Sequence, residues 1–195
     1  IPGFICAWRF GTDVVPFPLT EATLEAAALA GGGWVWLHLN LSDRRCLRWL
    51  TQSLAVPQVL ATEFTGAAFR QCLAGQGDYL IGHLNDFRQE FDRDCSEQAC
   101  LHLLMAKNFL LTGRVRAVQS AERLRRDLTR GMAFTGPAQL LSHAIANYPD
   151  TLDGLHHRLL DELEIIEDHV LDERHRGERK RLMLVRREMA QIHRH

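Results

Sequence analysis

The first third of the chain alternates between the residue spacing of strands and that of helices. Residues 4–10 and 34–39 are rich in β-forming side chains and predict two strands. Residues 34–39 are apolar at nearly every position, which is typical of a strand covered on both faces. Residues 21–30 are rich in alanine and stop at three glycines, which predicts a helix between the two strands. Residues 43–53 carry an apolar stripe behind Ser42, which predicts a second helix with Ser42 as its cap.

The middle of the chain favours antiparallel strands. Four β-rich runs, separated by glycine or charged turns, are found at residues 68–73, 79–87, 99–106 and 109–111. The charged stretch 88–97 predicts a loop or a hairpin tip, and residues 115–130 return to helical spacing. Because strands and helices interleave, we expect residues 1–133 to form an α/β domain in which helices cover a mixed β-sheet on both faces (α/β/α).

From residue 134 onwards the spacing is helical. A helix is predicted over residues 137–147, and we expect Pro149 to separate it from a long helix over residues 150–175. A last helix, from residue 178 onwards, repeats the apolar stripe. The long helix reaches roughly 39 Å at 1.5 Å per residue, whereas a compact chain of this length has a radius of gyration of only about 16 Å. Residues 134–195 are therefore expected to form a long helical hairpin that projects beyond the sheet.

Composition narrows the class of protein. The chain has 195 residues, of which 46% are hydrophobic and 24% charged, with a net charge of -1. These values exclude global disorder and argue against a dedicated nucleic-acid binder, which needs an excess of Lys and Arg. No run of about 20 mostly apolar residues predicts a membrane span. Five cysteines without a CxxC pair favour reduced thiols. Because no hydrolase, kinase or phosphate-loop signature is present, we predict no catalytic residue and no enzyme.

Charge reverses sign between the last two predicted helices. Residues 150–173 carry nine carboxylates against the single base Arg158, whereas residues 174–194 are mainly basic. A hairpin would place the acidic helix beside the basic one. Two interpretations stay open: a solvated face with ion pairs between the helices, or a face that attracts divalent cations.

Within the acidic helix, a few side chains have the spacing of metal ligands. Asp168, Asp172 and His175 lie at i, i+4 and i+7 and project from one side of a helix. Carboxylates together with an imidazole suit zinc or another divalent ion, so these three residues are the candidate ligands. His169 and Glu173 form a second candidate pair, one residue further round the helix.

Other conspicuous side chains are expected in the core. Trp34 and Trp36 face one side of their strand, where packing is the simpler interpretation than stacking on bases. His38, His83 and His102 also fall in predicted strands, and we expect each to be a core or edge residue with a backbone partner.

A set of short motifs runs in order across nearly the whole chain. Its members are a W-L-H-L-N segment at residues 36–40, a T-G-P linker, an acidic helical segment and an L-x-x-V-R-R start of the last helix. The residues that carry it are Trp36, His38, Asn40, Gly136, Pro137, Glu167, Asp168, Arg186 and Arg187. Together these motifs resemble the CorA-type divalent-cation transporters, and the W-L-H-L-N segment resembles their zinc-transporting, ZntB-type branch.

The resemblance implies a function that residue patterns alone do not give. It implies a homopentameric transporter of zinc or magnesium ions in the inner (plasma) membrane of a bacterium. By this resemblance, the chain is expected to correspond to the amino-terminal cytoplasmic domain, which gathers cations and regulates the pore. Because the chain lacks an initiator Met and ends in helical sequence, we expect it to be cut before the stalk and membrane spans, through which the protein contacts the membrane. The expected partners are divalent cations and further copies of the chain, without nucleic acid.

Two other functions remain open from the sequence. One is a soluble α/β interaction module whose helical hairpin docks a partner helix through its apolar stripe. The other is a metal-dependent hydrolase, although the sequence shows no ligands converging from strand ends.

Overall fold

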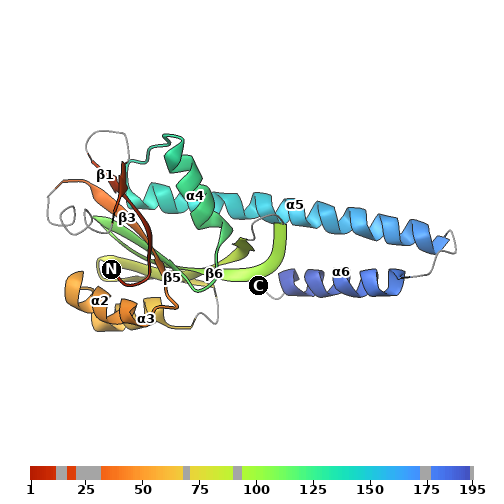
Figure 1. The fold of residues 1–195 in the computed structure, drawn as a ribbon, viewed down its shortest axis with the longest axis horizontal. Helices are drawn as coiled ribbons and strands as arrows, with labels where there is room; N and C mark the ends of the chain where they lie inside the picture. The colour runs from red at the N-terminus through yellow and green to blue at the C-terminus, as the bar shows by residue number, and fades with distance from the viewer. Residues whose placement is uncertain (12–16, 21–31, 68–70, 90–93, 172–176, 194–195) are drawn as a thin grey trace.

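The computed structural model describes residues 1–11, 17–20, 32–67, 71–89, 94–171 and 177–193 (Figure 1). In this part of the chain, a seven-stranded sheet has helices on both faces, and two long helices extend from it as an antiparallel hairpin. The predicted fold class, a mixed sheet covered by helices and followed by a projecting hairpin, is confirmed. The helix predicted over residues 21–30 lies outside the described residues.

The sheet consists of two antiparallel parts joined by one parallel strand pair. Its strand order is β2-β1-β3-β7-β6-β5-β4, and only β3 and β7 pair in parallel among the described strands. The strands are β1 (Phe4–Phe10), β2 (Phe17–Leu19), β3 (Trp34–Asn40), β4 (Cys72–Gln76), β5 (Tyr79–Gln89), β6 (Asp94–Ala106) and β7 (Phe109–Arg114). Strands β4 to β7 form a meander of sequence neighbours, whereas β3 pairs with β1 and β2 lies on the other side of β1.

The long β5–β6 ribbon differs from the sequence prediction. Strand β5 continues to Gln89 and β6 begins at Asp94, so the ends of the charged stretch 88–97 are strand and not loop. The apolar residues of β5 and β6 fix their register, and backbone hydrogen bonding then continues along the ribbon whatever the polarity of the side chains. Residues 90–93 lie outside the described part of the chain.

Short helices cover one face of the sheet. Helices α2 (Arg45–Ser53) and α3 (Gln58–Thr65) lie below the strands in Figure 1. Their apolar residues pack on inward-facing residues of β1, β3, β5, β6 and β7. The buried members of this cluster are Ala7, Leu37, Leu39, Leu41, Cys46, Leu50, Val56, Leu60, Ala61, Phe64, Ile81, Leu104 and Leu111.

The opposite face is covered by α4 (Gln119–Thr129) and the first part of α5 (Pro137–Leu171). This core is richer in aromatic residues, because β3 presents both of its tryptophans here and Trp34 stacks on Phe10 with ring centroids 3.7 Å apart. Its buried members are Trp8, Phe10, Trp34, Trp36, Leu103, Leu110, Leu124, Leu128, Phe134, Leu140, Leu141 and Ala144. The first three turns of α5 are therefore part of the core of the sheet domain.

Helix α5 is continuous where the sequence predicted two helices. It runs from Pro137 to Leu171 with Pro149 inside it. Proline in a helix interior removes one hydrogen bond and normally interrupts the helix. Here buried side chains hold the helix on both sides, with Leu141 and Ala144 before Pro149 and Leu155 after it. A break at Pro149 would uncover one of these two clusters, so tertiary packing overrides the local preference.

Helix α6 (Glu178–His193) returns alongside α5, as predicted. Gly177 precedes it with φ +97, a left-handed conformation that glycine adopts without a steric penalty. Among the helices that the structure describes, none combines the length and the hydropathy of a membrane span.

Candidate functional site

The helical hairpin is anchored on the sheet by one apolar cluster. This cluster joins β5, α5 and α6 and consists of Phe87, Leu155, Leu159, Ile166 and Val185. The ring of Tyr148 stacks on Phe87, with centroids 5.3 Å apart and planes at 13°. Beyond Ile166 the apolar stripe is less covered, and Val170 is 46% exposed. The hairpin is thus firmly packed at its base and open towards its bend.

Near the bend, polar side chains link the two helices. The carboxylate of Glu178 is buried and accepts a hydrogen bond from His169 Nδ1 at 2.7 Å. Arg181 donates from Nη1 to both Glu178 oxygens at 3.2 Å and from Nε to Glu162 Oε1 at 2.8 Å. The hydrogen bond from His169, followed by those from Arg181, lowers the pKa of Glu178. Glu162 on α5 and Glu178 on α6 both accept hydrogen bonds from this guanidinium, which ties the two helices together.

A second ion pair supports the interpretation of the hairpin as paired charges. Arg158 on α5 lies 3.9 Å from Glu188 on α6, measured from Nη2 to Oε2. Both groups are partly exposed, and such pairs contribute about 0–1 kcal/mol each. Not all acids are turned towards α6, however. The exposed carboxylates of α5 are those of Asp150, Asp153, Asp161, Glu164, Glu167 and Asp168.

The predicted metal ligands fall into two groups. Asp168 is exposed on α5, and His169 is engaged with Glu178 across the bend. Asp172, Glu173 and His175 lie outside the described residues. Within the described ranges, no group of three or more His, Cys, Asp or Glu side chains has the arrangement of a metal site. The candidate ligand set therefore stays a prediction.

The motif histidine and tryptophan of β3 meet at one hydroxyl group. Trp36 Nε1 donates to Thr112 Oγ1 at 2.8 Å, and His38 Nδ1 lies 2.8 Å from the same oxygen. All three side chains are buried. Burial, assisted by the nearby Arg114 guanidinium, lowers the pKa of His38 to about 3, so the ring is neutral at physiological pH. The expected core position of His38 is confirmed, with a side-chain partner in place of a backbone one.

The other two strand histidines are also buried. They are neighbours across the sheet, and their rings meet edge to face with centroids 4.6 Å apart. His102 Nδ1 donates to the carbonyl oxygen of Phe64 at 2.9 Å, which is the predicted backbone partner. His83 Nδ1 lies 3.7 Å from Cys72 Sγ. Burial lowers the pKa of both rings, that of His102 to about 4.

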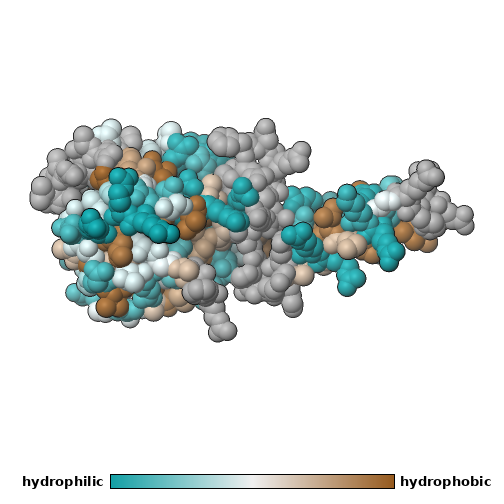
Figure 2. Space-filling model, turned by 60° about the horizontal axis from the view of Figure 1, so that its bottom comes forward, coloured by the Kyte–Doolittle hydropathy of each residue, from teal (hydrophilic) through white to brown (hydrophobic). Residues whose placement is uncertain are grey.

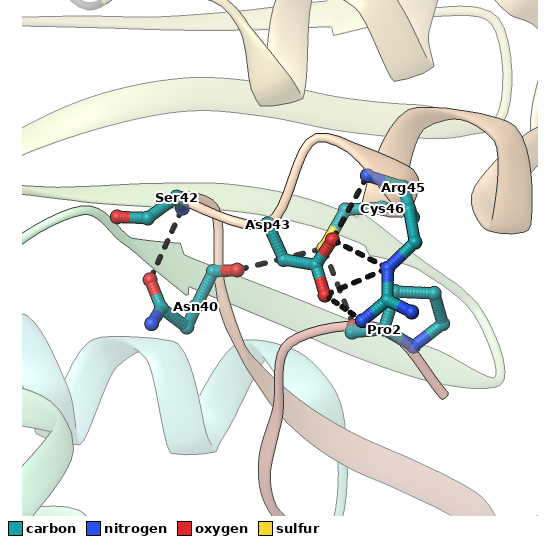
Figure 3. Close-up of polar contacts among 6 residues, drawn as sticks. All are labelled: Pro2, Asn40, Ser42, Asp43, Arg45 and Cys46. Atoms are coloured by element: carbon teal, nitrogen blue, oxygen red, sulfur yellow. Dashed lines mark hydrogen bonds and ion pairs between the residues drawn. The ribbon is translucent and has the colours of Figure 1, made fainter.

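Asn40 closes the turn between β3 and α2 (Figure 3). Its Oδ1 accepts a hydrogen bond from the Ser42 N–H at 3.0 Å, and Asp43 Oδ1 accepts one from the Arg45 N–H at 3.0 Å. The predicted cap role of Ser42 is wrong: α2 begins at Arg45 without a side-chain cap hydrogen bond. The reason is that Asn40 and Asp43 supply the side-chain acceptors of this turn. The Arg45 guanidinium beside it lowers the pKa of Asp43 to about 2.

The remaining motif residues lie at the ends and on the surface of the hairpin. Gly136 and Pro137 begin α5, and proline suits the first helical position, where its missing N–H has no partner to lose. Glu167 is exposed on α5, and Arg186 and Arg187 are exposed on α6.

Sequence reasoning missed two buried polar residues, each of which the fold brings to partners that are distant in the sequence. Thr112 joins β3 to β7 but shows no distinctive pattern in the sequence. Asp86 is buried on β5 and faces the start of α4, where it accepts hydrogen bonds from the Phe87 N–H at 2.7 Å, from the Ser120 N–H at 3.2 Å and from the Ser120 hydroxyl. Burial raises the pKa of Asp86. A carboxylate directly before Phe87 in a predicted strand is the signal that could have revealed it.

Comparison with known proteins identifies relatives along most of the chain. Residues 31–195 match the family model described as CorA-like Mg2+ transporter protein. The zinc transport protein ZntB of Yersinia pseudotuberculosis is 24% identical over 182 residues, which cover 88% of this chain and 54% of that protein. The chain thus spans about half the length of the curated relatives it matches.

Solved structures share the fold. The full-length CmaX protein superposes with a TM-score of 0.84 over 98% of this chain and 59% of its own, at 16% identity. The ZntB cytoplasmic domain of Vibrio parahaemolyticus superposes with a TM-score of 0.71 over 85% of this chain and 66% of its own, at 15% identity. Because the family model matches residues 31–195, well over half of the sequence, the chain belongs to the CorA-like Mg2+ transporter protein family.

Proposed function

We propose that the chain is the amino-terminal cytoplasmic domain of a divalent metal-ion transporter, where it gathers cations and regulates the pore. The observation that carries this proposal is the family match over residues 31–195, which includes the sheet from β3 onwards and the whole hairpin. In this role the chain has no catalytic activity. The complete protein would reside in a bacterial inner membrane as a homopentamer.

The geometry of the hairpin supports a role in gathering cations. It projects from the sheet and carries six exposed carboxylates along α5. A row of like charges on a protruding helix raises the local concentration of cations, and the effect weakens as salt screens it. A cation that binds one arrangement of the hairpin better than another shifts the balance between them by that difference in affinity. Asp168, Asp172 and His175, with His169 and Glu173, are the proposed ligands.

We favour zinc over magnesium as the transported ion. The W-L-H-L-N segment and the ZntB relatives support this choice, and an imidazole beside carboxylates suits zinc. Magnesium is bound mostly by carboxylates and water, so the exposed acids of α5 are compatible with it too.

The test is transport by the complete protein that contains this chain, reconstituted in liposomes with an entrapped zinc-sensitive dye. We expect zinc influx that protein-free liposomes do not show, and weaker uptake of magnesium measured with a magnesium dye. Flux of neither ion by correctly inserted protein would contradict the transport proposal. Magnesium uptake that exceeds zinc uptake would overturn the choice of zinc alone.

A second candidate function has its own observation. Apolar residues are exposed on the hairpin, among them Leu171 and Met183, and Figure 2 shows brown patches between the teal side chains of this part. In this alternative the chain is a soluble α/β interaction module, and its hairpin docks a helix of another protein through these apolar residues. A gene product without membrane spans that purifies as a monodisperse dimer would favour this function over transport.

A further inference from the structure

A small pocket opens beside His38, on the face of the sheet that α4 covers. It has a volume of about 50 Å³ and lies between β1, β3, the end of β7 and the first turn of α4. Its polar lining consists of Cys6, His38, Arg114, Glu122 and Arg125. Cys6 and His38 are directly opposite each other on β1 and β3. The side chains of Glu122 and Arg125 are 36% and 51% exposed and form the mouth of the pocket.

The hydrogen bonds around His38 are compatible with a ring proton on Nε2. An indole N–H only donates, so Thr112 Oγ1 accepts from Trp36. The hydroxyl proton of Thr112 is available to His38 Nδ1 at 2.8 Å, and in the tautomer that uses it Nδ1 is the acceptor. In this tautomer the proton of the neutral ring resides on Nε2. Nε2 is buried and has no hydrogen-bond partner among the described residues.

The polar groups that line the pocket together with His38 are mainly donors with positive charge. Arg114 and Arg125 bring two guanidinium groups, against one carboxylate, Glu122, which Arg125 contacts at 2.7 Å. Burial raises the pKa of the Cys6 thiol to about 12, so this group is also protonated and uncharged. The first turn of α4 borders the pocket, and the positive end of a helix dipole favours negative charge.

This chemistry decides between a metal cation and an anion. A metal cation would have to displace protons from His38 and Cys6 within a lining that holds two guanidinium groups against one carboxylate and is therefore net positive. An anion needs N–H donors and net positive charge, and both are present. The pocket volume is several times the minimum of about 10–15 Å³ for one ordered water.

We propose that this pocket binds a small monovalent anion, between a halide and nitrate in size, which accepts a hydrogen bond from His38 Nε2 and is held by Arg114 and Arg125. The bound anion links β1 and β3 to the start of α4. The site lies within the sheet domain, and its existence does not depend on the transport function proposed above.

The test is an anion titration of the purified protein at constant ionic strength, with sodium bromide replacing sodium gluconate, whose anion is too large for the pocket. We expect bromide to raise the melting temperature with a saturating dependence on its concentration. In ¹⁵N spectra of the histidine side chains, the His38 Nε2–H resonance should shift with the same midpoint. A linear response without saturation, or an unmoved His38 resonance, would show that only water fills the pocket and would overturn the proposal.

Two variants on the exposed side of α4 sharpen the test without disturbing the core. Arg125→Gln removes a guanidinium at the mouth and should raise the half-saturating bromide concentration about tenfold, the size expected for one charge-assisted hydrogen bond. Arg126→Gln removes the neighbouring exposed charge, which does not line the pocket, and should leave the midpoint unchanged. Equal midpoints for the two variants would exclude Arg125 as a ligand and contradict the proposed site.

Discussion

At the scale of single residues, Thr112 has a larger structural role than its size suggests. Its hydroxyl oxygen contacts the indole N–H of Trp36 and the imidazole of His38, and all three side chains are buried. A buried polar group that loses its only partner costs about 1–3 kcal/mol, which exceeds the net gain from forming an ordinary hydrogen bond. The hydroxyl of Thr112 therefore supplies a hydrogen-bond partner to two buried groups, the indole N–H of Trp36 and the Nδ1 of His38.

We predict that Thr112→Val lowers the free energy of unfolding by about 2–4 kcal/mol, because it leaves the indole N–H and the imidazole Nδ1 without a partner. Thr112→Ser keeps the hydroxyl group and should lose only about 1 kcal/mol for the missing methyl group. Urea denaturation monitored by tryptophan fluorescence measures both values. Equal losses in the two variants would show that the hydroxyl group contributes little.

At the scale of elements, α5 stays continuous although it contains Pro149, a residue that normally interrupts a helix. The carbonyl oxygen that Pro149 deprives of its partner belongs to Ile145, a residue that is 40% exposed, where water can take the hydrogen bond. The apolar clusters on both sides of Pro149 keep the helix axis continuous. Pro149 thus destabilises the helix locally, and the packing of the two apolar clusters outweighs this loss.

We predict that Pro149→Ala stabilises the protein by about 1–2 kcal/mol. The restored hydrogen bond and the relieved ring clash outweigh the greater freedom of the unfolded chain. Pro137→Ala is the matched control, because proline at the first helical position loses no hydrogen bond, and it should destabilise by about 0.5–1 kcal/mol. Thermal unfolding followed by circular dichroism distinguishes the two signs. A loss of stability in Pro149→Ala would show that the fold depends on proline at this position.

Local periodicity predicted most elements because burial patterns are local in the sequence. The stripe Val118, Ala121, Leu124 and Leu128 is buried as expected, and β3 differs from its prediction by one residue. Helix continuity at Pro149 could not be predicted, because it depends on packing partners in other elements, such as Phe87 on β5 and Val185 on α6.

The candidate site was predictable only in part. Spacing within one helix selected Asp168 and His169, and Asp168 is indeed exposed on α5. Spacing cannot show a partner across a bend, so Glu178 and Arg181 were missed as the groups that engage His169. Thr112 was missed for the same reason, since its partners on β3 are more than seventy positions away.

At the scale of the whole molecule, an anchored base and an open bend divide the hairpin into two parts. Buried side chains attach the base to β5, while exposed carboxylates continue along α5 towards the bend. Ligands that bind near the bend therefore act on the less constrained part of the hairpin. The electrostatic attraction of a row of exposed charges extends only about 10 Å at 0.1 M salt and about 3 Å at 1 M.

We predict that millimolar zinc raises the melting temperature at low salt, and that 1 M sodium chloride reduces the shift. Asp168→Asn combined with Asp172→Asn should reduce the shift at low salt, because it removes two proposed ligands. Asp150→Asn combined with Asp153→Asn, at the base of the same helix, is the control with the same change in net charge. Equal shifts in the two double variants would remove Asp168 and Asp172 as ligands and leave the family membership untouched.

The parallel pairing of β3 with β7 has a consequence for the synthesis of the protein. Strand β3 is paired on its first side by β1, but its second partner follows roughly 70 residues later in the chain. At about 5–20 residues per second, a ribosome needs roughly 4–14 s to supply it. During that interval the nascent chain carries an unpaired, strongly apolar strand edge, the kind of surface that pairs with other chains. The yield of folded protein in a cell therefore depends on how well this edge is shielded until Arg114 has left the ribosome.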